Sequence, residues 1–215
     1  MKKVLFLSFI ITSMFYTITI ANKLYNISPQ KIDAIKKKYG KKAERRFLIW
    51  DKVMQSAKNK DILHKLKDVN DFWNKVAYRS DLVHWRKKDY WASPYEFLGT
   101  GAGDCEDYAI AKYFSLRQLG IPENKLRITY VKLKRRSTRY DEAHMVLTYY
   151  HKPDSTPIVL DNIDKRLKLA TKRTDLLPVY SFNASGLWQA KNKGRTSIRV
   201  GKNNLSNWKS LMTRI

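Results

Sequence analysis

The stretch Gly101-Ala102-Gly103-Asp104-Cys105-Glu106-Asp107 contains the single cysteine of the 215-residue chain. A helical repeat of apolar residues begins at Asp104 and is closed by Gly120 and Pro122, which places Cys105 at the N-terminus of a predicted helix. Unpaired N–H groups and the helix dipole at that position would lower the pKa of a thiol and hold a developing oxyanion. A structural cysteine would be expected in an apolar stretch, whereas carboxylates surround this one. Cys105 is therefore predicted to be a reactive thiol.

The base for this thiol has to come from one of four histidines, His64, His84, His144 and His151. The first falls within a predicted helix and the last beside a turn, which are ordinary surface positions. The second lies in an aromatic segment and remains an alternative. His144 begins a strand-like run and alternates with Met145 and Leu147, so its side chain faces the other side of the strand. Cys–His pairs are usually built from a strand histidine and a helix N-terminus, so His144 is the predicted base.

Asp161 is the carboxylate predicted to orient His144. It follows the apolar run Pro157-Ile158-Val159-Leu160, which is predicted to be a strand. An antiparallel pairing of this strand with the strand of His144 would bring the two side chains together. The alternative is ordinary turn chemistry in Asp161-Asn162.

The apolar pattern predicts an α+β fold, with N-terminal helices packed on an antiparallel sheet. The segment from Asp81 to Gly103 shows no period and is rich in aromatic and turn residues, so it is predicted to be a long loop that lines the site. A tight turn is predicted at residues 152–155. The predicted helices span residues 29–39, 43–54, 61–76 and 104–119, and the predicted strands span residues 126–133, 143–150 and 158–160.

The first residues are typical of an export signal. A basic start is followed by an uncharged stretch from Val4 to Asn22, which includes the small-residue pattern Thr19-Ile20-Ala21. We predict a signal peptide at residues 1–21 and a single domain at residues 22–215 that lies outside the cytoplasm. An uncleaved membrane anchor is the alternative, because the stretch is close to the length that spans a bilayer. A single cysteine cannot form an intramolecular disulfide in that oxidising environment, which favours a thiol kept for its reactivity.

The formal net charge is +24, from 43 Lys and Arg residues against 19 Asp and Glu residues. Such a surface favours anionic partners. No nucleic-acid-binding motif accompanies it, so nucleic acid is not a predicted partner. The simplest interpretation is a solvated basic surface. The basic residues are dispersed over residues 31–46, 132–139, 165–173 and 191–202.

Longer motifs extend on both sides of the predicted site, between Asp89 and Trp188. They are Asp89-Tyr90-Trp91-Ala92-Ser93-Pro94, Gly103-Asp104-Cys105-Glu106-Asp107-Tyr108-Ala109-Ile110-Ala111-Lys112, Ala143-His144-Met145-Val146-Leu147, Leu160-Asp161-Asn162 and Pro178-Val179-Tyr180-Ser181-Phe182-Asn183. In order and spacing they closely resemble the bacterial transglutaminase-like cysteine proteinases of the LapG type.

The resemblance implies a papain-like or transglutaminase-like fold with a Cys-His-Asp triad. Cys105 would be the nucleophile, His144 the base and Asp161 the orienting carboxylate. It further implies a periplasmic cysteine endopeptidase that cleaves the N-terminal region of a large surface adhesin and so controls biofilm release. An inner-membrane receptor for cyclic-di-GMP would be the inhibitory partner, and residues matching Asp104 and Glu106 would bind calcium.

The acidic residues around Cys105 also indicate a cation from their own chemistry. Asp104, Glu106 and Asp107 would be expected to oppose thiolate formation by like-charge repulsion. Helix capping accounts for one or two of these acids but leaves the repulsion in place. A calcium ion held by Asp104, Glu106 and, as a further candidate, Asp107 would cancel it, and hard oxygen ligands favour calcium over zinc.

Two further questions stay open on the sequence. Trp91 is the candidate for a second oxyanion donor, because its indole N–H is a fixed donor on a segment that passes near the site, and simple wall packing is the alternative. The same triad could also serve a transglutaminase-like acyl transferase or amidase. A basic binding module without catalysis is a third class.

Overall fold

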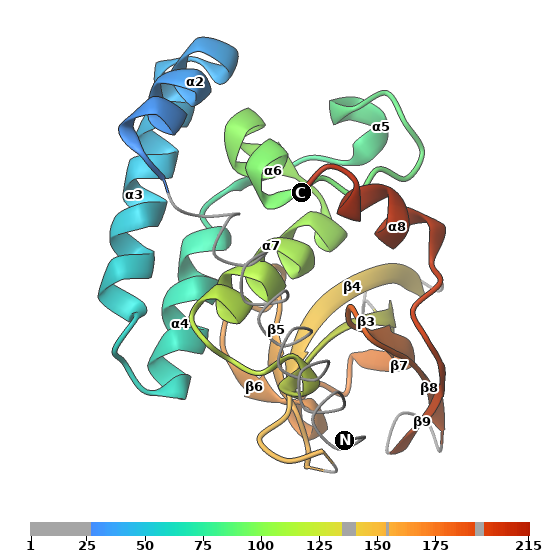
Figure 1. The fold of residues 1–215 in the computed structure, drawn as a ribbon. Coiled ribbons are helices and arrows are strands. Elements are labelled where there is room, and N and C mark those ends of the chain that lie inside the picture. The colour runs from blue at the N-terminus through green and yellow to red at the C-terminus, as the bar shows by residue number, and fades with distance from the viewer. Residues whose placement is uncertain (1–26, 135–140, 154, 192–195) are drawn as a thin grey trace, which may run out of the picture.

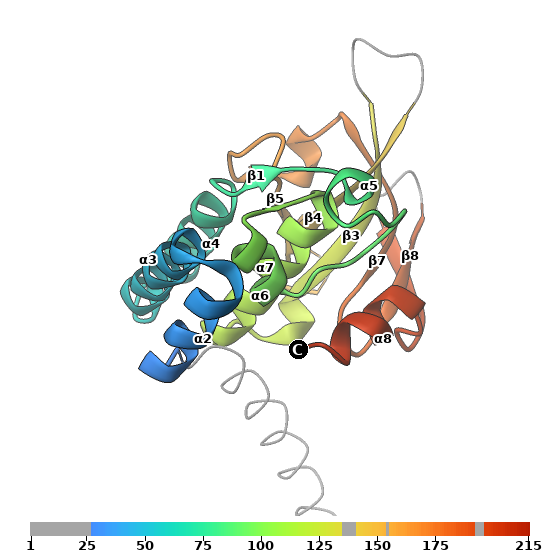
Figure 2. The same cartoon turned by 90° about the horizontal axis from the view of Figure 1, so that it is seen from above.

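A central antiparallel sheet organises the fold, and helices cover one of its faces (Figure 1). The computed structural model describes residues 27–134, 141–153, 155–191 and 196–215, so the predicted signal peptide lies outside the described residues. Within them, seven strands form the sheet in the order β6-β5-β4-β3-β7-β8-β9. The view from above shows the helices layered against this sheet (Figure 2). The predicted α+β architecture is confirmed.

Three N-terminal helices form the outer layer, and their ends follow from local sequence. α2 (Pro29–Tyr39) begins after Ser28, whose side chain accepts a backbone hydrogen bond of 3.4 Å from the first turn. Gly40 ends this helix with a φ of 84°, in the left-handed region that glycine adopts without strain. α3 (Lys41–Ala57) and α4 (Ile62–Trp73) follow.

The aromatic residues of these helices lie in the core, as predicted. Phe47, Trp50 and Trp73 are each at most 2% exposed. The third predicted helix is too long, because α4 ends at Trp73 with Asn74 as its C-cap and Val76 lies beyond it.

The prediction of a long loop between residues 81 and 103 is wrong. The structure has two helices in this segment, α5 (Asp81–His84) and α6 (Pro94–Thr100). β2 (Ala102–Gly103) then pairs in parallel with β1 (Ala77–Tyr78). Both helices are too short for a helical period to appear in the sequence.

The two ends of α6 are nevertheless specified by the sequence. Ser93 and Glu96 exchange hydrogen bonds in a capping box at its start. At its end, Gly101 has a φ of 77°, and Arg46 of α3 donates to the carbonyl oxygens of Leu98 and Gly99 at 2.7 and 2.6 Å. Arg46, which ends the first basic run, is thus a helix cap and not a solvated charge.

α7 (Cys105–Gln118) is the central helix and lies between the other helices and the sheet (Figure 1). Every residue from Glu106 to Leu116 is buried. It packs against β3 (Leu126–Leu133) and β4 (Glu142–Tyr149) on one side and against α4 on the other. The predicted helix at this position is confirmed, and its first residue, Cys105, is half-buried.

The predicted strands are confirmed as β3, β4 and β5 (Ile158–Leu160), and the C-terminal third adds strands that the sequence did not reveal. The predicted turn between β4 and β5 includes residue 154, which lies outside the described residues. The additional elements are β6 (Lys168–Leu169), β7 (Leu176–Phe182), β8 (Leu187–Lys191), β9 (Thr196–Gly201), α8 (Ser206–Met212) and the 3-10 turns Glu123–Lys125 and Ala170–Lys172.

The C-terminal helix α8 returns to the core. Trp208 is 4% exposed and stacks on Phe114 of α7, with ring centroids 5.8 Å apart. Among the described residues, no helix has the length and apolarity required to cross a membrane.

Candidate active site

Cys105 is the first residue of α7, and a short polar network fixes this helix end. The Asp104 N–H donates to Oδ2 of Asp107 at 3.2 Å, and the Ala92 N–H donates to the other oxygen at 2.8 Å. Asp107 therefore ties the helix start to the segment before α6. Gly103 is required here, because a Cβ at this position would lie 2.7 Å from the ring of Phe97.

The thiol of Cys105 is held by two neighbours. Its Sγ donates to Oε2 of Glu106 at 3.0 Å, and the Met145 N–H of β4 hydrogen-bonds the sulfur. Burial and the charges of Glu106 and Asp104 raise the pKa of the Cys105 thiol well above its ordinary value, and the Met145 N–H only partly opposes the rise. The lowering expected from the helix N-terminus is therefore outweighed by the adjacent carboxylates.

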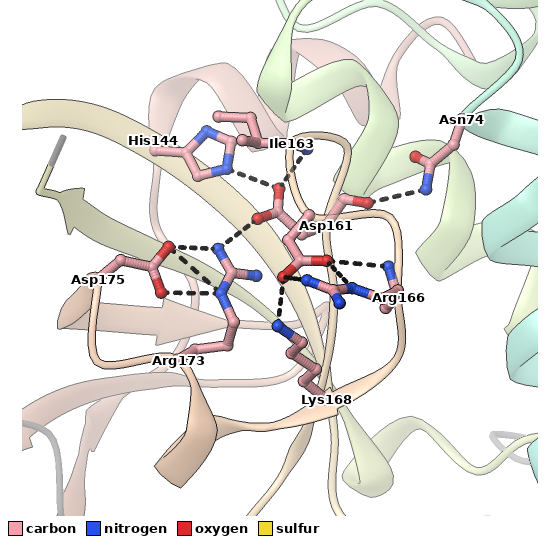
Figure 3. Close-up of polar contacts among 9 residues, drawn as sticks. Asn74, His144, Asp161, Ile163, Arg166, Lys168, Arg173 and Asp175 are labelled. Carbon is pink, nitrogen blue, oxygen red and sulfur yellow. Dashed lines mark hydrogen bonds and ion pairs between the residues drawn. The ribbon is translucent and has the colours of Figure 1, made fainter. Parts of the chain in front are cut away.

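His144 and Asp161 form a buried pair (Figure 3). Nε2 of His144 lies 2.8 Å from Oδ1 of Asp161, and the two side chains are 4% and 0% exposed. Asp161 directly follows β5, which pairs antiparallel with β4, so the side chains meet as the strand pairing predicted. Because a carboxylate accepts at Nε2, that nitrogen carries the proton and Nδ1 is left to act as a base.

Asp161 is satisfied at each of its oxygens. Oδ1 also accepts the Ile163 N–H at 3.0 Å, Oδ2 accepts from Nη2 of Arg173 at 2.7 Å, and the backbone carbonyl accepts from Nδ2 of Asn74 at 2.8 Å. Burial alone would raise the pKa of Asp161, but hydrogen bonds from His144, Ile163 and Arg173 hold it well below its ordinary value. The turn at this aspartate thus exists together with the His144 contact and is not an alternative to it.

The structure places the thiol beside the strand that carries His144, without a hydrogen bond between the two side chains. Within the described part of the chain, Sγ of Cys105 donates to Glu106, and Nε2 of His144 is engaged with Asp161. α7 packs on β4, and Met145, whose N–H contacts the sulfur, is the residue next to His144. Release of the thiol from Glu106 is therefore required before a Cys–His pair can form.

The other histidines have different surroundings. Nε2 of His84 lies 2.9 Å from the hydroxyl of Thr100, and burial followed by the charge of Arg79 lowers the pKa of this histidine. His64 and His151 are exposed, as predicted. Only His144 combines a carboxylate partner with burial.

Carboxylates from three segments converge next to Cys105. Oxygens of Asp81, Asp104 and Asp107 lie within 4.8 Å of one another, and so do oxygens of Asp81, Asp89 and Glu106. Each of the three predicted ligands therefore belongs to a cluster that could hold a metal ion. Asp81 and Asp89 join them from α5 and from the segment after it.

The chemistry of this cluster fits a hard divalent cation. In the described part of the structure, no hydrogen-bond donor reaches the buried Oδ1 of Asp81 or the buried Oδ1 of Asp104. Burial raises the pKa of Asp81 to about 6, of Glu106 to about 7 and of Asp104 to about 8, and neighbouring carboxylates contribute to each rise. Orphaned carboxylate oxygens at this spacing are what calcium coordinates. Asp107 fits less well, because both of its oxygens accept backbone N–H groups.

Trp91 lies next to this cluster. Its indole N–H donates to Oδ1 of Asp89 at 2.9 Å, and its ring stacks on Phe182 with centroids 5.4 Å apart. In the structure this side chain packs beside the site and donates to Asp89. Its role as an oxyanion donor stays a prediction, since that role requires the indole N–H to leave Asp89.

The C-terminal residues hold the segment that carries Asp89. Nδ2 of Asn207 donates to Oδ2 of Asp89 at 2.6 Å. Arg214 donates to the Tyr90 hydroxyl at 2.6 Å and to the Trp91 carbonyl at 2.8 Å, and it also pairs with a carboxylate oxygen of Glu96 at 2.7 Å. Asn207 and Arg214 therefore fix the position of the segment that carries Asp89.

Sequence reasoning missed Asp81, Asp89 and Arg173. Asp89 lies in one of the quoted motifs, so that motif was a usable signal. Asp81 follows Ser80 at the start of a four-residue helix, and only the folded chain reveals that it approaches Asp104. Arg173 belongs to a basic run that was interpreted as solvated surface, yet it is 3% exposed.

A single cysteine at a helix N-terminus, beside an antiparallel strand that carries a buried histidine–carboxylate pair, defines a cysteine protease of the transglutaminase-like class. The sequence profile of the bacterial transglutaminase-like cysteine proteinases, BTLCP, matches residues 41–193. The chain belongs to this family, and it is a cysteine protease of the LapG type.

Solved structures of Legionella pneumophila LapG are similar over most of the chain. The EGTA-treated form is 41% identical, with a TM-score of 0.74, and the alignment covers 87% of this chain and 97% of that one. The calcium-bound form is also 41% identical, with a TM-score of 0.73, and the alignment covers 87% of this chain and 99% of that one. A search of curated protein sequences gives no significant match.

Proposed function

We propose that the chain is a periplasmic cysteine endopeptidase that cleaves the N-terminal region of a large surface adhesin and thereby controls biofilm release. The observation that carries this proposal is the 2.8 Å contact between His144 and Asp161, which commits Nε2 and leaves Nδ1 as a base. Membership of a cysteine proteinase family supports Cys105 as its nucleophile. The likeness to LapG supports the choice of substrate and location.

The triad residues would act in a fixed order. Nδ1 of His144 takes the proton of the Cys105 thiol, and Asp161 stabilises the resulting imidazolium through Nε2. The thiolate attacks the scissile carbonyl carbon, and backbone N–H groups at the start of α7 hold the oxyanion. When the tetrahedral intermediate collapses, the C–N bond breaks, the imidazolium protonates the leaving amine and a thioester to Cys105 remains. Water, deprotonated by His144, then attacks the thioester and releases the acid and the free thiol.

Asp104 and Glu106 would hold a calcium ion, with Asp81 and Asp89 as further ligands and Asp107 as the weaker candidate. When bound there, calcium supplies positive charge that offsets the repulsion between these carboxylates and a thiolate. As one of these ligands, Glu106 would hold the thiol proton of Cys105 less strongly, which would free Sγ for His144. The existence of calcium-bound and EGTA-treated forms of LapG supports this assignment.

An inner-membrane receptor that responds to cyclic-di-GMP is the proposed inhibitory partner, and the periplasm is the proposed location. Both rest on the likeness to LapG-type proteases and on the export signal expected at residues 1–21. Nucleic acid is not a proposed partner. Mass determination of the exported protein tests the location, because a cleaved signal gives an N-terminus near Asn22 and an anchored form retains Met1.

The test of the activity is incubation of the exported protein with the N-terminal region of the adhesin in calcium, followed by mass spectrometry. We expect two fragments from the native enzyme and none from Cys105→Ala. His64→Ala is the matched control, because this exposed histidine should be dispensable. An amine-tagged or cross-linked product would replace hydrolysis by acyl transfer, and an unchanged adhesin would contradict both reactions.

A further inference from the structure

Arg173 is a buried base with no role in the triad chemistry described above. It follows the 3-10 turn Ala170–Lys172, and its side chain is 2% exposed. Burial of a guanidinium is costly unless several hydrogen bonds compensate it. Its position therefore calls for an explanation.

The guanidinium of Arg173 bridges two carboxylates (Figure 3). Nη2 donates to Oδ2 of Asp161 at 2.7 Å. Nε and Nη2 bind the two oxygens of Asp175 at 2.9 and 2.8 Å, in a bidentate fork. The Asp175 side chain is 40% exposed, so a chain of contacts runs from the surface through Arg173 to Asp161 and then to His144.

This arrangement determines which oxygen of Asp161 accepts the hydrogen bond from His144. A carboxylate has two equivalent oxygens, and rotation about its bond to Cβ exchanges them. The planar guanidinium fixes Oδ2 in one direction, which leaves Oδ1 facing Nε2 of His144. The positive charge of the guanidinium also offsets part of the negative charge that Asp161 places beside the imidazole of His144. Lys112 of α7 and Asp175 also interact electrostatically with Asp161. Lys112 is 1% exposed, and burial lowers its pKa to about 7 against the attraction of Asp161.

We propose that Arg173 is a positioning residue of the active site, which holds Asp161 so that His144 keeps its proton on Nε2 and offers Nδ1 to the thiol. Its meaning for catalysis rests on the proposed protease function, but the arrangement itself can be measured without any substrate. Asp175 supports it from the surface by orienting the guanidinium.

The test is ring-nitrogen NMR of His144 as a function of pH, in a Cys105→Ala background that removes the thiol. We expect the unmutated site to show the tautomer protonated at Nε2. Arg173→Gln should mix the two tautomers and move the pH midpoint of the ring signals upward, because a positive charge near the imidazolium is lost while Asp161 stays ionised. Arg173→Lys keeps the charge but not the planar fork, so it should restore the midpoint more fully than the tautomer.

Arg166→Gln is the matched control. It removes the same charge seven residues away, but Arg166 is 76% exposed and pairs with Asp164. It should leave the His144 spectrum unchanged. A merely structural Arg173 would lower the melting temperature on substitution and leave the His144 tautomer and titration unchanged, and that result would overturn the proposal.

Asp175→Asn keeps the proposal testable if Arg173→Gln does not fold. It disturbs the fork from a half-exposed position and should shift the His144 titration in the same direction by a smaller amount. Native spectra in both Asp175→Asn and Arg173→Lys would also overturn the proposal. With the thiol present, Arg173→Lys should lower kcat for adhesin cleavage more than it changes KM. If the native enzyme does not cleave the adhesin, the proposed function fails, and the NMR result still decides the role of Arg173.

Discussion

Sγ of Cys105 donates a hydrogen bond of 3.0 Å to Oε2 of Glu106. The proposed nucleophile is therefore hydrogen-bonded to a carboxylate that is also a candidate calcium ligand. A cation bound by Glu106 would withdraw electron density from this carboxylate and weaken its hydrogen bond with the thiol. We therefore expect calcium binding at the carboxylate cluster and activation of the thiol to be coupled through Glu106.

The reactivity of Cys105 should consequently depend on calcium. In EGTA, burial and the charges of Glu106 and Asp104 raise the pKa of the thiol, so iodoacetamide alkylation should be slow at neutral pH and rise only above the ~8.5 of a free cysteine. Calcium should move the midpoint of this profile below ~8.5. The measurement is the pH dependence of the alkylation rate, followed by mass spectrometry of the peptide that contains Cys105.

Glu106→Gln is the informative comparison for that experiment. It removes one negative charge beside the thiol, so alkylation in EGTA should become faster, while the response to calcium should weaken. Identical profiles of the native protein with and without calcium would contradict the coupling between the ion and the thiol.

Asp81 should be needed for calcium binding although it lies 24 positions before Cys105 in the chain. Its orphaned, buried Oδ1 lies in the carboxylate cluster, so Asp81→Asn should weaken calcium binding by tenfold or more, as about 1.4 kcal/mol of lost ligand interaction would do. Isothermal titration calorimetry measures the affinity directly. Calcium at a hundred times its dissociation constant should also stabilise the native protein by about 2.7 kcal/mol. Asp164→Asn is the control, and equal affinities in both variants would exclude Asp81 as a ligand.

The site could be predicted from the sequence wherever its chemistry depends on neighbours along the chain. Cys105 at a helix start needs only the local pattern around it. Asp161 beside His144 needs one further step, the antiparallel pairing of two adjacent strands. By contrast, the N–H of Asp81 donates to Oδ2 of Asp104, 23 positions further along the chain, and no local pattern around Asp81 signals that contact.

The fold shows the same limit for short elements. α2 was predictable because Ser28, Pro29 and Gly40 specify its ends around a clear apolar stripe. α6 has only seven residues and no visible period, although its capping box and its initial proline were present in the sequence. β6, β8 and β9 are mostly half-buried or exposed, so they lack the apolar runs that marked β3, β4 and β5.

Asp161 should give the protein a specific sensitivity to acid. Its pKa is lower in the folded state than the ~3.9 of an unfolded aspartate, so its contribution to stability is present above about pH 4 and is lost as the pH falls toward the folded value. Asp161→Asn should be less stable than the native protein at pH 7 and should lose this part of the acid dependence. Urea unfolding between pH 3 and pH 7 in EGTA measures both. Asp33→Asn, on an exposed position of α2, should keep the native acid profile.

Arg214 should matter for the site despite being the penultimate residue. Its contacts with Tyr90, Trp91 and Glu96 hold the segment that carries Asp89. Arg214→Ala should destabilise the fold by about 1.5–3 kcal/mol, the range for hydrogen bonds to a charged group, and should lower calcium affinity. Chemical denaturation and calorimetry measure the two effects. A loss of stability with unchanged calcium affinity would limit Arg214 to packing.

Trp91 provides the last test, because its indole N–H has two possible acceptors, the carboxylate of Asp89 and the oxyanion that forms on the substrate. In the structure it donates to Asp89, which also accepts from Asn207 and belongs to the carboxylate cluster. If calcium draws the carboxylate of Asp89 toward itself, the indole N–H becomes free to turn to the oxyanion that forms on the substrate. Trp91→Phe keeps an aromatic ring for stacking on Phe182 and removes only the donor, so kcat should fall by about 10²–10³ with little change in KM. Steady-state kinetics on the adhesin fragment measure this, with Trp85→Phe as the control for a neighbouring ring. An unchanged kcat in Trp91→Phe would leave Trp91 as a wall residue and would require the second oxyanion donor to be a backbone N–H.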